Sequence, residues 1–447
     1  MDKPPATKLA YSPPRASLLS NFMWMTAGNA TVKPLWFLFV TALCMRVLGP
    51  AAYGIFTSVL ALAMILTLLG DLGTTAWATR EVARAHESAS SYLTNLFVGR
   101  LTIEVAVICA APLIAMLLGY DRATTLALVA ACLYAAGLKL ILLPRVAFRA
   151  FEVFRYEAIS IVAERALVIA GGTTGLLTTR TPEGALFGMA AGMGLAVLLN
   201  SLWVHKRLVP LQPNLFDLRF LYRVHRNALP LGTYVLLAIV YGRVAPILLV
   251  QLEGEVTAGL YGVAARVLEL LTALPLILNQ VLLPRLTALN KDGDSEALYR
   301  LIDWGLFLGM GGAICVAAIF TFLGPTIIHL LDPNPAYAPA GQLLRVLIWV
   351  FPLITGTMVL TQAMIAAAEL RFIAVLMTGA LLLFLVLNIL LIPRFSYYGT
   401  TAGLLVCQAI VFVGMLLRLR RHRGRPKYAS ISLSSGTCSY VQPEGSL

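Results

Sequence analysis

The residues of this 447-residue chain that could do chemistry are charged side chains inside long apolar runs. An ionised group near the centre of a membrane helix costs about 3 kcal/mol, so it tends to face a cavity or a charged partner. Lys33 and Arg243 lie near the middle of their runs and have no acidic residue within four positions. Such cations suit an anionic ligand. Three further cations are candidates for the same cavity: Arg266, Lys139 and Arg345.

Two other interpretations stay open for charges of this kind. Long basic side chains can direct their charge toward the membrane interface, an alternative that is strongest for Lys139, near the end of its run. Arg266 and Glu269 are spaced to pair along one helix face, and so are Arg100 and Glu104. This spacing fits a structural ion pair and a cavity lining equally well.

Asp71 is the only acidic residue of its apolar run, in the sequence Gly70-Asp71-Leu72-Gly73. It could bind a coupling cation or proton, pair with a basic residue, or cap a helix break that the two glycines favour. Pairing or capping is the preferred interpretation, because the equivalent position in the second half of the chain is the nearly isosteric Asn279. We group four residues under pairing, hinge or coupling: Asp71, Glu269, Asn279 and Gln280.

Enzyme motifs are not found in this sequence. It has no P-loop, no HExxH, no GxSxG in a strand-to-helix context, and no Cys/His cluster with metal-ligand spacing. The sequence therefore predicts no catalytic residue, no metal site and no cofactor. A coupling ion, H⁺ or Na⁺, is not specified by these residues.

The elements that carry the charges are membrane helices. With 59% hydrophobic residues, 12% charged residues and a mean hydropathy of +0.83, the chain is too apolar for a soluble domain. Apolar runs long enough to span a bilayer predict an all-α integral membrane protein with about twelve transmembrane helices. The runs centre near residues 31, 65, 106, 134, 167, 195, 240, 271, 312, 353, 382 and 409.

The formal net charge of +13 is explained by topology. If both termini are cytoplasmic, most of the 34 Lys and Arg residues fall in inside segments, such as residues 205–226 and the region after residue 417. This distribution follows the positive-inside rule. The basic balance therefore predicts a multi-pass protein with cytoplasmic termini, and no nucleic-acid partner.

A motif near the start of the chain is repeated in its second half. Tyr53-Gly54 opens one apolar run and Tyr261-Gly262 opens another, and the same spacing relates Asp71 to Asn279. Six helices per half predict a parallel internal repeat, in which two six-helix bundles enclose a central cavity. The predicted domains are a cytoplasmic segment, two bundles and a disordered cytoplasmic tail, at residues 1–17, 18–212, 213–420 and 421–447.

Several motifs resemble a known family. LGPAAYG is followed by DLG and Arg80-Glu81, and Tyr241-Gly-Arg243 leads through LEGEVTAGLYG to Val281-Leu-Leu-Pro-Arg285. This pattern resembles the polysaccharide-transport (O-antigen/oligosaccharide flippase) branch of the multidrug/oligosaccharidyl-lipid/polysaccharide exporter superfamily. One departure concerns Ala245, where family members often carry an acidic residue. That departure puts a coupling role at this position in doubt.

The resemblance implies a function and partners. It implies a bacterial inner-membrane flippase that moves a lipid-linked oligosaccharide, usually undecaprenyl-diphosphate-linked, by alternating access during cell-surface polysaccharide biosynthesis. The implied partners are membrane lipid, a polysaccharide polymerase and glycosyltransferases. A diphosphate headgroup needs cations, which Arg243, Lys33 and Arg266 would supply.

Other functions remain alternatives. A cation-coupled multidrug exporter should favour carboxylates in its cavity, and a peptidoglycan-precursor flippase would share the diphosphate chemistry. A membrane glycosyltransferase or polymerase belongs to a different class and needs a large polar loop, whereas residues 205–226 are short and basic. A purely structural scaffold is disfavoured because intramembrane charges are costly to keep without use.

Overall fold

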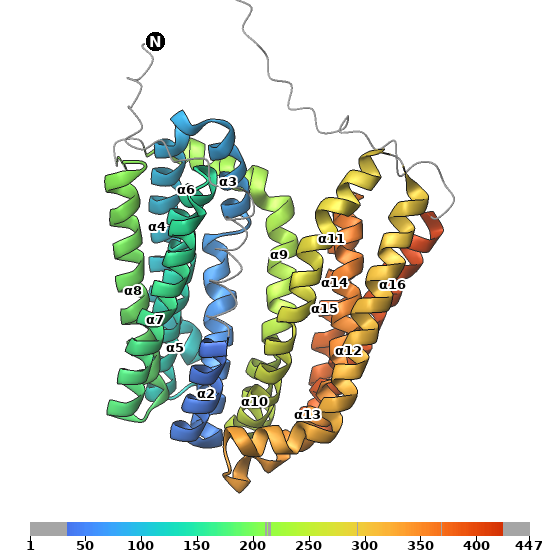
Figure 1. The fold of residues 1–447 in the computed structure, drawn as a ribbon. Coiled ribbons are helices and arrows are strands. Elements are labelled where there is room, and N and C mark those ends of the chain that lie inside the picture. Colours follow the sequence, from blue (N-terminus) through green and yellow to red (C-terminus); the bar gives the residue numbers. More distant parts are fainter. Residues whose placement is uncertain (1–33, 211, 213–215, 293, 368, 423–447) are drawn as a thin grey trace, which may run out of the picture. The chain divides into compact units, whose positions relative to one another are not determined.

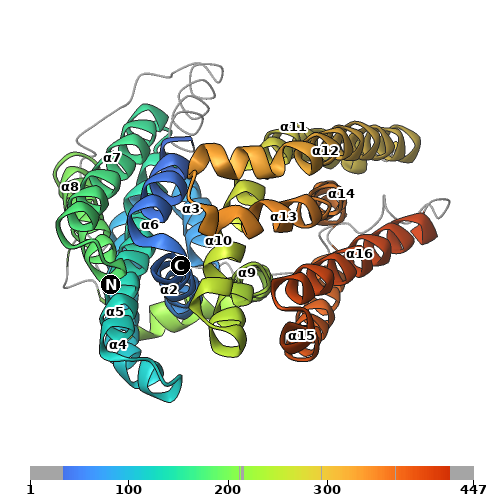
Figure 2. The same cartoon turned by 90° about the horizontal axis from the view of Figure 1, so that it is seen from below.

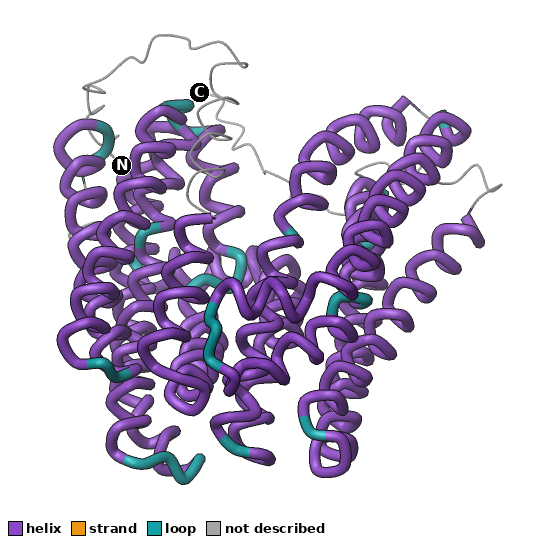
Figure 3. The backbone as a smooth tube through the Cα atoms, turned by 60° about the horizontal axis from the view of Figure 1, so that its bottom comes forward, coloured by secondary structure: helices purple, strands orange, loops and turns teal. Residues whose placement is uncertain are grey.

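The structure, a computed structural model, describes residues 34–210, 212, 216–292, 294–367 and 369–422 (Figure 1). Within these residues it contains helices joined by short connections and no strand (Figure 3). The first part comprises η1 Leu38–Leu43, α2 Cys44–Leu66, η2 Thr67–Gly70, α3 Thr74–Arg84, η3 His86–Ser88, α4 Ala89–Leu117, α5 Arg122–Leu140, α6 Leu142–Ala150, α7 Phe154–Thr179 and α8 Pro182–Arg207. The second part comprises α9 Leu218–Glu253, α10 Glu255–Leu271, α11 Ala273–Asp292, α12 Ser295–Leu331, η5 Pro335–Tyr337, α13 Ala338–Leu347, α14 Val350–Ala366, α15 Leu370–Phe395 and α16 Tyr397–His422.

The predicted membrane helices are present. In the described part of the chain, 10 helices are long and apolar enough to cross a membrane, and a pair bent by 46°, residues 335–347 and 350–366, makes up to 11. The first predicted run, centred near residue 31, begins outside the described residues and continues into the helix that starts at Pro34. The prediction of an all-α integral membrane protein is therefore confirmed.

Local sequence signals explain where several helices begin or bend. Asp121 caps α5 by accepting a hydrogen bond from the backbone N–H of Thr124 at 2.9 Å, a common N-cap arrangement. Gly49 has a φ of 72° directly before Pro50, and a kink divides the helical stretch there. Glycine adopts this left-handed conformation without steric cost, and proline cannot continue the backbone hydrogen bonding of a helix. The kink separates the first two predicted apolar runs.

The described chain forms two compact units. The larger unit lies within residues 1–270, 320–348 and 381–404, and the smaller within residues 271–319, 349–380 and 405–447. Hydrogen bonds tie the later segments of the larger unit to its first helix: the Tyr337 hydroxyl donates to the Met45 carbonyl at 2.9 Å, and Arg46 Nε donates to the Leu331 carbonyl at 2.5 Å. The predicted division near residue 212 is a different partition and stays a prediction.

The smaller unit is held together by apolar packing and a few polar contacts. The Gln408 side chain donates to the Thr357 hydroxyl at 3.0 Å, and Asn290 donates to the Ala366 carbonyl at 3.1 Å. These bonds join α16 to α14 and α11 to α14. Arg418 and Glu369 form an ion pair at 3.1 Å within the same unit.

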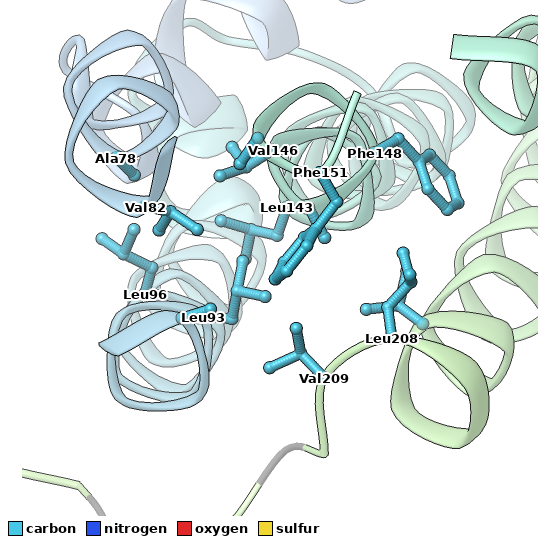
Figure 4. Close-up of a cluster of buried hydrophobic side chains, with 14 of the residues drawn as sticks. Ala78, Val82, Leu93, Leu96, Leu143, Val146, Phe148, Phe151, Leu208 and Val209 are labelled. Carbon is cyan, nitrogen blue, oxygen red and sulfur yellow. The ribbon is translucent and has the colours of Figure 1, made fainter. Parts of the chain in front are cut away.

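A cluster of buried apolar side chains fixes one end of the larger unit (Figure 4). It brings together α3, α4 and α6 with the chain that follows α8. The labelled members are Ala78, Val82, Leu93, Leu96, Leu143, Val146, Phe148, Phe151, Leu208 and Val209. Because α3 and α6 are short, this burial is what holds them against the long helix α4.

The two copies of the repeated motif lie against each other in the larger unit, where α2 and α10 are neighbours (Figures 1 and 2). A Cβ atom added to Gly54 would meet the Glu255 carbonyl and would lie 2.9 Å from the Gly259 nitrogen. A Cβ added to Gly259 would meet the Pro50 carbonyl and would lie 3.1 Å from the Gly54 nitrogen. Glycine is therefore required on both sides of this crossing, as in close membrane helix pairs.

We expect Gly54→Ala to destabilise the protein by about 1–3 kcal/mol, since the added methyl group overpacks the crossing. Gly194→Ala is the matched control, because Gly194 is also helical and nothing lies within 4 Å of its added Cβ. Thermal unfolding of the purified protein in detergent measures both. Equal stability of the two variants would contradict the close approach.

Candidate functional site

Two predicted site residues meet around one carboxylate. Arg243 on α9 donates to Glu269 on α10 at 2.9 Å, and Arg266, three residues before Glu269, donates to it at 2.7 Å. The side chain of Arg266 is 12% exposed, that of Arg243 33% and that of Glu269 48%. The carboxylate therefore lies between two guanidinium groups from different helices and neutralises only one of them.

Aromatic side chains and a third arginine extend this group. Arg165 on α7 stacks over the Trp36 ring, 4.7 Å from its centroid, and donates to the Tyr134 hydroxyl at 3.3 Å. Trp36 and Tyr134 stack with ring centroids 6.3 Å apart and planes 17° from parallel. Arg165 forms an ion pair with Glu164 at 3.5 Å and has a weaker electrostatic interaction with Glu269.

The Tyr53 hydroxyl from α2 lies close to Arg266. We call the whole set the arginine–aromatic cluster, which consists of Arg165, Arg243, Arg266, Glu269, Trp36, Tyr53 and Tyr134. Arg243 and Arg266 exceed the single carboxylate of Glu269 by one positive charge, while Arg165 pairs with Glu164. Guanidinium groups bind phosphate through paired N–H donors, and the Tyr53 and Tyr134 rings are buried beside them. This chemistry suits an anionic ligand with a phosphate group.

Asp71 lies in a separate buried network. Its Oδ1 accepts a hydrogen bond from Arg100 on α4 at 2.6 Å and from the backbone N–H of Thr75 at 3.0 Å. Arg100 is fully buried and also donates to the hydroxyl groups of Thr74 and Thr75, each at 2.7 Å. Its other terminal nitrogen donates to the Lys139 carbonyl on α5 at 2.8 Å. Asp71 thus pairs with a basic residue and bonds to the first turn of α3.

The backbone beside Asp71 adopts an unusual conformation. Leu72 and Gly73 have φ values of 37° and 81°, so the chain turns sharply between η2 and α3. Gly73 is also approached closely by α9, since its added Cβ would lie 2.9 Å from the Gly232 nitrogen. A left-handed turn is strained, so it persists inside a buried region only where several contacts hold it in place. Arg100 and α9 provide that support.

The remaining predicted site residues lie elsewhere. Lys139 is half-buried beside Arg100, whereas Arg345 on α13 is exposed and donates to Gln342 at 3.1 Å. Asn279 on α11 is buried, and its side-chain amide has no hydrogen-bond partner among the described groups. Lys33 lies outside the described residues, and the Gln280 side chain is not described.

Sequence reasoning missed the aromatic part of the cluster and gave no role to Arg165. In the structure Glu164 pairs with both Arg145 and Arg165, the latter at 3.5 Å. No spacing in the sequence signals that Arg165 stacks over Trp36, because the two residues lie on distant segments.

The family of the chain follows from comparison with known sequences. The family described as "Polysaccharide biosynthesis protein" matches residues 18–290, more than half of the chain. The chain belongs to this family. Its membership confirms the resemblance seen in the motifs.

The capsular polysaccharide biosynthesis protein CapF of Staphylococcus aureus is 25% identical over 167 residues, which are 37% of this chain and 42% of that protein. That alignment spans less than half of the relative.

Solved structures of transport proteins share the fold. An inward-facing multidrug resistance transporter of the MATE family aligns with a TM-score of 0.69 at 16% identity, over 89% of this chain and 94% of that one. The lipid II flippase MurJ aligns with a TM-score of 0.68 at 13% identity, over 90% and 87%. A MOP superfamily transporter from Pyrococcus furiosus aligns with a TM-score of 0.60. At 13–18% identity, these three structures show a shared fold.

The buried ion pair generates a stability prediction. We expect Asp71→Asn to lower the free energy of unfolding by about 3–5 kcal/mol, because the buried Arg100 would lose the carboxylate that it contacts at 2.6 Å. The control is Glu296→Gln, which removes a carboxylate from the exposed pair with Arg300 and should cost less than about 1 kcal/mol. Chemical denaturation in detergent measures both. Similar losses for the two variants would contradict a structural role for the buried pair.

Proposed function

We propose that this protein is a flippase-like secondary transporter of an anionic lipid-linked oligosaccharide, such as an undecaprenyl-diphosphate-linked saccharide. The observation that carries the proposal is that two arginines, Arg243 and Arg266, share the single carboxylate of Glu269. Membership of the polysaccharide biosynthesis family and the fold of known transporters support it. The protein would work by alternating access, in cell-surface polysaccharide biosynthesis.

The cluster suggests how such a ligand binds. A diphosphate would take the place of Glu269 as the partner of Arg243 and Arg266, releasing the carboxylate toward Arg165. Exchanging one anion for another leaves no buried guanidinium unpaired at any stage, which avoids the cost of an uncompensated charge. The partly buried Trp36 ring would contact a sugar ring or an isoprenoid chain beside this exchange, while the buried Tyr134 ring stacks on Trp36.

The proposal includes a membrane location and partner enzymes. The protein would reside in a bacterial inner membrane with both termini in the cytoplasm, where cytoplasmic glycosyltransferases load its substrate and a polysaccharide polymerase uses the product. A peptidoglycan precursor carries the same headgroup chemistry and is the nearest alternative substrate. A cation-coupled drug exporter fits less well, because its substrates would meet the arginines. Covalent sugar transfer by the purified protein in lipid would contradict the proposal.

Arg243→Ala tests the role of the cluster. We expect transport of the lipid-linked saccharide to fall about tenfold to a hundredfold, the effect of losing one charged hydrogen bond to phosphate. Protein abundance in the membrane should not change, because Arg243 is partly exposed and Glu269 keeps Arg266 as a partner. Arg300→Ala is the control, since it removes an arginine from an exposed pair. Wild-type transport by Arg243→Ala would remove Arg243 from the site.

Glu269→Gln should act in the opposite direction on binding. Loss of the competing carboxylate leaves Arg243 and Arg266 free for a phosphate, so we expect a soluble diphosphate to bind more tightly than to the wild type. Isothermal titration with inorganic pyrophosphate in detergent measures this difference. The gain should shrink as the salt concentration rises. Unchanged or weaker binding would indicate that Glu269 does not compete with the ligand.

A further inference from the structure

One buried carboxylate in the larger unit is not used by the arginine–aromatic cluster. Glu104 on α4 is 1% exposed, and both of its carboxylate oxygens lack a hydrogen-bond partner among the described groups. Other carboxylates of this unit have ion-pair partners: Asp71, which is 14% exposed, bonds to Arg100, and the buried Glu157 and Glu164 bond to Arg149 and Arg145. Glu104 is therefore an exception that needs a chemical explanation.

The surroundings of Glu104 come from three elements. Gly70 of η2 faces it so closely that an added Cβ would meet its Oε1. The charged groups that act on it are Lys139 from α5, Arg100 from its own helix and Asp71 from the turn after η2. Arg100 is committed to Asp71, at 2.6 Å. Lys139 contributes its backbone carbonyl to Arg100, and no ion pair between Lys139 and Glu104 occurs in the described residues.

An ionised carboxylate in this position would be poorly compensated, because burial removes its water and no donor replaces that water. A neutral carboxylic acid avoids the penalty. A metal cation in the same place would lie beside the positive charges of Arg100 and Lys139, which would repel it. The species that fits the site is a proton.

We propose that Glu104 is a proton-binding site, protonated in the conformation described here and ionised in a second conformation in which Arg100 or Lys139 turns toward it. On ionisation the O–H bond of the carboxylic acid breaks, the electron pair stays on the carboxylate oxygen, and the proton passes to water. No other reactant is needed.

The position of Glu104 connects this proton to the helix break at Asp71. Arg100 lies four residues before Glu104 on α4, so one guanidinium can serve either Asp71 or Glu104 by changing rotamer. When Arg100 turns to an ionised Glu104, the Asp71 turn loses its main cross-helix bond. Proton binding itself is independent of the proposed transport function, and its use to drive transport rests on that function.

Infrared difference spectroscopy of the purified protein in lipid tests proton binding directly. Raising the pH should remove a carboxylic-acid carbonyl band in the wild type, and this band should be absent in Glu104→Gln. Glu296→Gln is the control, because Glu296 is 85% exposed, and it should keep the band. Glu104→Asp should shift the band without abolishing it, which provides a second test if Glu104→Gln fails to fold. A band that persists in Glu104→Gln, or one that is lost in Glu296→Gln, would overturn the proposal.

A transport assay separates the two proposals. If both hold, Glu104→Gln loses the dependence of saccharide transport on a pH gradient, and the variant still binds inorganic pyrophosphate like the wild type. If the wild type shows the infrared band but moves no lipid-linked saccharide, proton binding stands and the transport proposal fails. If the wild type transports the saccharide but lacks the band, the proton site fails and the transport proposal stands.

Discussion

The ion pair between Asp71 and Arg100 is the contact on which the larger unit depends. Arg100 has no exposed surface, so its charge is tolerable only because a carboxylate, two hydroxyl groups and a backbone carbonyl satisfy it. These acceptors come from the turn before α3, from α3 itself and from α5. One guanidinium therefore fixes the position of α4 relative to its neighbours and stabilises a turn that has two residues with positive φ.

Charge is distributed differently in the two polar regions of this unit. Both terminal nitrogens of Arg100 donate to protein groups, so in this conformation its charge is compensated within the fold. In the arginine–aromatic cluster Arg243 and Arg266 share Glu269, which is 48% exposed, whereas Arg165 pairs with Glu164. A carboxylate with that exposure is held less firmly than a buried one, so an external anion can compete for its partners. The excess charge is tolerable where water or a ligand can reach it.

The sequence predicted the elements well because apolar runs of membrane length have few alternative structures. It also placed Arg266 beside Glu269 correctly, since both lie on one helix. Ion-pair partners on different helices could not be predicted from the sequence. Pairing with Glu104, one turn away, was one of two interpretations for Arg100, whereas in the structure Arg100 pairs with Asp71. The stack of Trp36, Tyr134 and Arg165 joins three segments far apart in the chain, and no local pattern encodes such a meeting.

The crossing of α2 and α10 at Gly54 and Gly259 links the two copies of the repeated motif. Each copy has the other copy as its neighbour, and backbone atoms of one helix occupy the space that a side chain on the other would need. A bulky substitution in one copy can therefore be compensated only by a change in the other. The two copies cannot vary independently at this crossing.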